Sequence, residues 1–191
     1  MQRGSVTRES ILRQLRDSEV AASRLIAGVS EIQGNWQPQG GQDWSIWQCV
    51  EHLSLTNHVY AEALKHGLAS ARPNQRNATG QEIKPGWFGR WFISKVEPPV
   101  GIGVRTKPKA TPELKGNLGQ ALGRFVESHE AYREIVKLWD GVDFNRVRYP
   151  NPFIPLIRFT IGTGLQIANA HDRRHLWQAQ RVKEAPEYPK A

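Results

Sequence analysis

The sequence contains very little cysteine and no long apolar run, and both absences restrict the kind of protein it can encode. Cys49 is the one cysteine in 191 residues, so no disulfide can form within the chain, and this usage suits a reducing cytoplasm. No stretch approaches the roughly 18 consecutive apolar residues that a membrane-spanning helix needs. The N-terminal segment also lacks the apolar core of a signal peptide. We therefore expect a cytoplasmic protein with no membrane partner.

Sequence motifs of several large enzyme classes are also missing. The chain has no HExxH, no GxSxG, no CxxC and no Walker phosphate-binding loop. Zincin-type peptidases, α/β-hydrolases and P-loop nucleotidases are therefore not expected.

The sequence does contain an excess of positive charge. Its formal net charge is +8, and its 39% apolar and 23% charged residues are typical of a folded globular chain, which we expect to form one domain over residues 1–191. Between residues 71 and 115, nine lysines and arginines accompany three glutamates. A basic patch attracts nucleic acid or an anionic small molecule. Because no basic stripe repeats along a helix, a solvated loop is the simpler interpretation, and we do not expect a nucleic-acid partner.

Four stretches have the apolar spacing of amphipathic helices. They cover approximately residues 8–29, 45–68, 111–140 and 157–183, and Thr111 with Pro112 marks the expected start of the third. Between the second and third lies an irregular, proline-rich segment, residues 70–110, whose aromatic stretch GWFGRWF we expect to pack on the helices. So long a connection can join two parallel helices. The pattern predicts an all-α four-helix bundle with a long crossover loop between helices 2 and 3.

Two histidines near the end of the chain raise the question of a metal site. His171 and His175 lie four residues apart in NAHDRRHLWQAQ, so a helix would project both imidazoles from one face. Such a pair also occurs on solvated helix faces, and a metal site needs a third ligand from elsewhere. His52, in WSIWQCVEHLSLTN, is the best candidate for that ligand. A histidine beside an apolar stripe is, however, also typical of a packed core residue.

The other candidate ligands are less convincing. His58 and His66 fall near the polar face and the end of the second helix, where solvation is the default. His129 is flanked by glutamates in VESHEAY, and we expect it to be exposed. Cys49 is expected to be inert packing, and Asp172, although adjacent to His171, should point away from it.

These segments together resemble the DinB-like (DinB/YfiT) superfamily of metal-dependent proteins. The resemblance rests on WSIWQCVEHLSLTN, on the upstream NWQP followed by Trp44, and on the terminal HDRRHLWQAQ, and it covers nearly the whole chain. It implies a four-helix bundle in up-down-down-up order. It also implies a metal held by one histidine of the second helix and two of the fourth, here His52, His171 and His175. Gln178, one turn beyond His175, would line the site or support a ligand, unless it only makes an interhelical hydrogen bond.

The resemblance also implies a class of activity. Three neutral imidazoles suit zinc, nickel or a similar divalent ion. Characterised relatives include thiol-dependent S-transferases that use bacillithiol or mycothiol, which implies a metal-dependent transferase or hydrolase acting on a small molecule such as a low-molecular-weight thiol. The alternative is a non-catalytic bundle that is stabilised by metal or serves in regulation or stress. A homodimer is compatible with such a bundle.

Overall fold

The computed structural model describes residues 6–99 and 107–190, most of which are helical. Residues 100–106 of the basic segment 71–115 lie outside the described residues. The elements, in chain order, are α1 (Arg8–Ile26), α2 (Glu31–Asn35), α3 (Ile46–Ala69), α4 (Trp87–Val96), α5 (Leu118–Lys137), β1 (Arg148–Pro150), β2 (Arg158–Thr160) and α6 (Ile161–Lys183), with short 3-10 turns at Gln39–Gly41, Pro73–Gln75 and Pro108–Ala110. The all-α prediction fits this content, apart from the small antiparallel sheet of β1 and β2.

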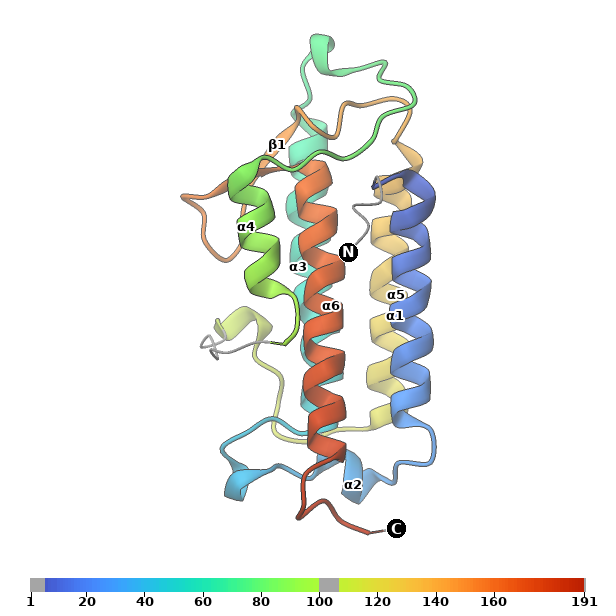
Figure 1. Ribbon diagram of the computed structural model, residues 1–191, viewed down its shortest axis with the longest axis vertical. Helices are drawn as coiled ribbons and strands as arrows, with labels where there is room; N and C mark the ends of the chain where they lie inside the picture. The colour runs from blue at the N-terminus through green and yellow to red at the C-terminus, as the bar shows by residue number, and fades with distance from the viewer. Residues whose placement is uncertain (1–5, 100–106, 191) are drawn as a thin grey trace.

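The long helices α1, α3, α5 and α6 lie side by side along the long axis of the molecule (Figure 1). As the colours in Figure 1 show, α1 and α6 run in one direction and α3 and α5 in the other. Helix α3 packs against α5 and α6, and α1 packs against the same two helices. The connection from α3 to α5 therefore travels the length of the molecule. No helix among the described residues is long and apolar enough to cross a membrane.

Local capping chemistry determines where the helices begin. Helix α3 starts after Ser45, whose side chain accepts from the backbone N–H of Gln48 in a capping box. The predicted start of the third helix at Thr111 is wrong. The Thr111 hydroxyl donates to the Lys107 carbonyl, and α5 begins only after Asn117, whose side chain caps the helix.

Two other predicted helix boundaries are also corrected by the structure. The last helix begins at Ile161 rather than near 157, because residues 158–160 pair with residues 148–150 as a strand. The first helix ends at Ile26, and a separate short helix, α2, follows it. The irregular segment contains α4, which packs against α6. The expectation that its aromatic stretch packs on the helices is confirmed for Phe88 and Phe92, whereas Trp87 and Trp91 are exposed.

The interior between the long helices has an apolar cluster at each end and a polar layer in the middle. One cluster includes Leu15, Tyr60 and Tyr132, and the other includes Leu25 and Phe125. The polar layer includes the buried side chains of Ser18, His52, Thr56, Asn57, Ser128, His129, Asn169, Asp172 and His175, together with the partly buried His171. Since buried polar groups are costly unless they have partners, this layer is where function is to be sought.

Candidate metal centre

The three histidines proposed from the sequence meet in the polar layer. His52 comes from α3, and His171 and His175 come from successive turns of α6. One ring nitrogen from each lies within 4.8 Å of the others. The Nε2 atoms of His52 and His171 are 3.4 Å apart. The packing of α3 against α6 therefore brings together residues that are more than 100 positions apart in the sequence.

Hydrogen bonds on the outer nitrogens orient two of the imidazoles. Nδ1 of His52 lies 2.6 Å from the carbonyl oxygen of Ala110, which can only accept, so Nδ1 carries the proton. Nδ1 of His175 likewise lies 2.9 Å from Oε1 of Gln178. Both arrangements leave Nε2 with a lone pair available to a metal ion, as a donor bond on the opposite nitrogen does in metal sites. Nδ1 of His171 is buried without a hydrogen-bond partner in the described part of the chain.

Burial keeps the three imidazoles neutral. It lowers the pKa of His52 to about 4, although the hydrogen bond to Ala110 opposes this shift. Burial also holds the pKa values of His171 and His175 well below their usual range, and the neighbouring histidines and Arg174 lower them further. Neutral imidazole is the form that coordinates a metal. The donor set and its protonation therefore fit a divalent cation.

The indole of Trp44 covers one side of the cluster. Its ring centroid lies 4.8 Å from that of His52 and 5.7 Å from that of His175. Trp44 immediately precedes Ser45, so the cap that starts α3 also fixes this aromatic wall. Large apolar surfaces beside a polar site restrict water and strengthen electrostatic interactions inside it.

No fourth histidine, cysteine or carboxylate joins the cluster among the residues that the structure describes. Cys49 is fully buried, and its burial raises the pKa of the thiol well above its usual range. His58 and His66 are exposed, as expected. If these three histidines held an ion, coordination positions would be left for water or substrate, which is typical of catalytic rather than structural zinc sites.

The expectation that His129 is exposed is wrong. Its side chain is completely buried, with Nδ1 2.8 Å from Glu19 Oε1 and Nε2 3.0 Å from Asp172 Oδ2. Asn57 also donates to Asp172, at 3.2 Å. Burial alone would lower the pKa of His129, but Asp172 and Glu19 outweigh burial and raise it to about 9. Asp172 does point away from the histidine cluster, into a cluster of ionic and hydrogen-bonded side chains that connects α1, α3, α5 and α6.

The sequence carried a signal for His129 that its charged neighbours obscured. It follows Phe125 by four residues and precedes Tyr132 by three, so it belongs to the buried stripe of α5. Its partners Glu19 and Asp172 lie on other helices. Sequence spacing alone could not have identified them.

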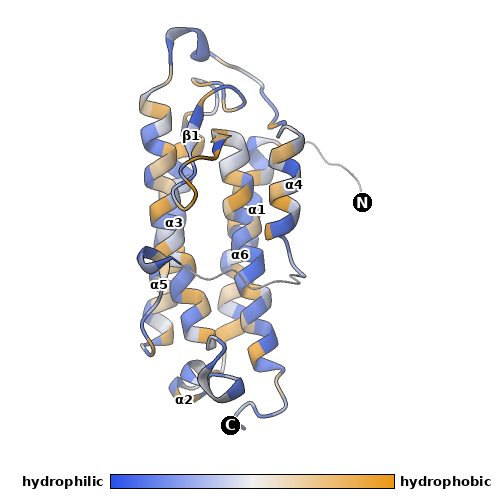
Figure 2. Ribbon diagram, turned by 90° about the vertical axis from the view of Figure 1, so that its left-hand side faces the viewer, coloured by the Kyte–Doolittle hydropathy of each residue, from blue (hydrophilic) through white to orange (hydrophobic). Residues whose placement is uncertain are grey.

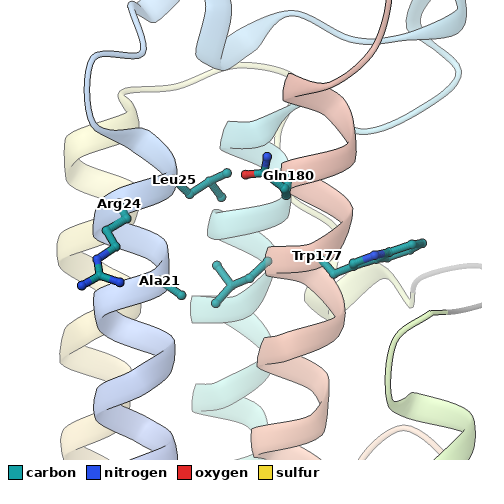
Figure 3. A pocket seen from close by; sticks show the side chains of 6 residues that line it. Ala21, Arg24, Leu25, Trp177 and Gln180 are labelled. Carbon is teal, nitrogen blue, oxygen red and sulfur yellow. The ribbon is translucent and has the colours of Figure 1, made fainter.

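A shallow hollow of about 340 Å³ lies between α1 and α6 (Figure 3). Its lining residues are Ala21, Arg24, Leu25, Leu176, Trp177 and Gln180. None of the three histidines lines it. The histidine cluster, with its convergent nitrogen atoms, is therefore the stronger candidate for the functional site.

A family model described as the DinB superfamily matches residues 14–179, a range that includes the three histidines and Gln178. No curated protein and no solved structure matches the chain.

Proposed function

Because the chain belongs to the DinB superfamily, we propose that it is a metal-dependent enzyme that binds a divalent ion through His52, His171 and His175. In this proposal the four long helices form an up-down-down-up bundle, and the ion lies between α3 and α6. The opposite directions of α1 and α6 relative to α3 and α5 support this topology (Figure 1). Zinc and nickel are among the divalent metals that suit three neutral imidazoles.

The observation that carries the proposal is the convergence of ring nitrogens from three imidazoles, two of which are oriented by a hydrogen bond on the outer nitrogen. Ala110 and Gln178 hold the Nδ1 protons of His52 and His175, so the Nε2 lone pairs face the cluster. Facing lone pairs repel one another, and a cation between them relieves that repulsion.

The surroundings favour catalysis on a small molecule. A divalent ion bound here would lower the pKa of a coordinated thiol or water and so make a nucleophile available at neutral pH. The chain's own contribution is to orient the imidazoles and to cover one side of them with Trp44. We infer that the substrate is a low-molecular-weight thiol with an electrophile, or a hydrolysable ester or amide. Nucleic acid is not a proposed substrate.

Activity of metal-loaded protein tests this function. The protein is stripped of metal, reloaded with Zn²⁺ or Ni²⁺, and assayed for conjugation of bacillithiol or mycothiol to a panel of electrophiles and for hydrolysis of esters and amides. We expect turnover that requires the metal, is lost in His171→Ala and persists in His66→Ala, which changes an exposed histidine. A loaded protein that turns over no member of the panel would contradict the enzymatic proposal.

A second candidate is a non-catalytic bundle that uses the ion as a brace or serves in regulation or stress. This candidate is favoured because the three histidines come from two helices, so that an ion held by His52, His171 and His175 would link α3 to α6. Removing the metal with a chelator should then greatly lower the melting temperature. An enzyme would lose activity with only a modest change in stability. Cytoplasmic location and homodimer formation stay predictions.

A further inference from the structure

One side of the molecule carries large exposed apolar side chains. It is formed by α4 and by the hairpin that joins β1 to β2, which lie on the left in Figure 1 and face the viewer in Figure 2. The exposed side chains are Trp87 (75% exposed), Trp91 (51%), Ile154 (43%) and Leu156 (98%). We call the surface defined by these four residues the α4–hairpin face. In Figure 2 the hairpin is coloured as strongly hydrophobic where it faces the viewer.

Helix α4 already has an inner face that is packed. The rings of Phe88 and Phe92 lie 5.8 Å and 4.9 Å from the ring of Phe159 on β2. Trp87 and Trp91 are four residues apart and therefore share the outward face. A solvated helix face usually carries charged side chains, so two outward tryptophans indicate an interaction surface.

The hairpin holds its apolar tip in a fixed position. Asn151 is 1% exposed, and its Oδ1 accepts from the backbone N–H groups of Phe153 and Ile154. Its Nδ2 donates to the Tyr60 hydroxyl at 2.9 Å. The ring of Phe153 also packs against that of Tyr60. The loop is thus anchored to α3, and Leu156 projects from an anchored loop.

The charged residues of α4 and of the hairpin are all basic, although the exposed Glu82 lies two residues before Lys84. Residues 84–96 and 148–160 contain five basic residues and no acidic residue. All five are exposed: Lys84, Arg90, Lys95, Arg148 and Arg158. Glu97, just beyond the first range, is already paired with Arg173 of α6. The partner of this face should therefore combine negative charge with an apolar interior.

We propose that the α4–hairpin face binds the surface of an anionic lipid bilayer. Tryptophan side chains are enriched at membrane–water interfaces, and exposed aliphatic side chains insert just below the headgroups. The surrounding lysines and arginines contact the anionic headgroups. The absence of a spanning helix, on which the sequence-based expectation of no membrane partner rested, does not bear on binding of this kind.

Other partners fit the face less well. A second copy docked through the same face would bring the five basic residues of one copy close to the five basic residues of the other. A single-stranded nucleic acid would use the tryptophans for stacking, but Ile154 and Leu156 offer it neither an aromatic surface nor a hydrogen bond. A bilayer surface accommodates the tryptophan, the aliphatic and the basic side chains of this face together.

Co-sedimentation with lipid vesicles tests the proposal. We expect the wild-type protein to sediment with vesicles of phosphatidylcholine and phosphatidylglycerol, and not with phosphatidylcholine alone. The variants Trp87→Ala/Trp91→Ala and Leu156→Ser should each bind vesicles at least about tenfold more weakly, because they remove apolar area that the bilayer would bury. Ile32→Ser is the matched control, since Ile32 is 79% exposed on α2, at the other end of the molecule (Figure 1).

Two further double variants distinguish binding through this face from a general attraction of a basic protein to anionic vesicles. Lys84→Glu/Arg158→Glu and Arg13→Glu/Arg16→Glu change the net charge equally, but only the first pair lies beside the α4–hairpin face. We expect only the first pair to abolish vesicle binding. Equal losses in both pairs, no sedimentation of the wild-type protein, or binding to an RNA oligonucleotide in its place would overturn the proposal. Folding of each variant is checked by its melting temperature.

Discussion

The Nδ1–H groups of His52 and His175 donate to different kinds of acceptor. His52 uses a backbone carbonyl, that of Ala110, which no substitution at that position would remove. His175 uses the side chain of Gln178 on its own helix, one turn further on. Gln178 is therefore the point at which the orientation of a proposed ligand can be changed without touching the ligand itself.

Replacing Gln178 by alanine should weaken metal binding. We expect about a tenfold or greater loss of affinity, since the acceptor that orients His175 is removed. Gln178→Glu should retain the affinity, because a carboxylate also accepts from Nδ1–H. Affinity is measured by competition with a chromophoric chelator, with the exposed Gln180→Ala as control. Equal affinities for wild type and Gln178→Ala would show that Gln178 makes only a structural hydrogen bond.

At this scale helical spacing and family resemblance pointed to the same three histidines, His52, His171 and His175, and the structure brings their ring nitrogens together. Their role as metal ligands stays a prediction. The prediction for His129 was wrong, because the flanking glutamates suggested an exposed position although His129 belongs to the apolar stripe of α5. The burial of His129 depends on Glu19 and Asp172, which helix packing brings together from α1 and α6. Such partners become visible only once the helices are placed in space.

Among the helices, α6 packs very closely against its neighbours in its first turns. A Cβ added to Gly164 would lie 2.7 Å from Leu64 of α3 and 2.5 Å from the Tyr149 hydroxyl. The helix predicted from the sequence over residues 157–183 includes this glycine, but its start lies four residues before the observed start at Ile161. The pairing of β2 with β1, which ends at Thr160, could not be inferred from helical periodicity.

Two glycine substitutions test this close contact. Gly164→Ala should lower the free energy of unfolding by about 1–3 kcal/mol, because the new methyl group overpacks the contact with α3. Gly123→Ala on α5 should raise it by about 0.5–1 kcal/mol, since a Cβ there meets nothing within 4 Å and alanine favours the helix. Urea denaturation measures both. A stabilising Gly164→Ala would mean that α3 and α6 are further apart than described.

Across the whole molecule, a buried ion cluster links α1, α5 and α6, and the neutral side chain of Asn57 joins it from α3 by a hydrogen bond to Asp172. His129 lies between Glu19 of α1 and Asp172 of α6, and Arg133 on α5 also pairs with Glu19. The pKa of His129 is about 9 in the folded protein, compared with about 6.5 for an unperturbed histidine. Folding therefore favours the protonated form.

This shift predicts how stability depends on pH. Because the folded pKa is raised, the contribution of His129 is complete below about pH 6.5 and is lost as the pH rises through about 9. At about 1.4 kcal/mol per pKa unit, the loss is on the order of 3 kcal/mol. Urea denaturation from about pH 6 to about pH 10, a range that includes both the unfolded and the folded pKa of His129, should show this decline in wild type and in His66→Gln. His129→Gln should lack it, and an unchanged decline in that variant would assign the effect to another group.

Metal content measures the central claim most directly. Wild-type protein, His52→Ala, His171→Ala, His175→Ala and the control His66→Ala are dialysed against Zn²⁺ or Ni²⁺ and then against buffer, and bound metal is counted by elemental mass spectrometry. We predict about one ion per chain in wild type and His66→Ala, and strongly reduced metal in the other three, because each lacks one of only three ligands. Full metal content in His52→Ala, His171→Ala and His175→Ala would show that these histidines do not form the metal site.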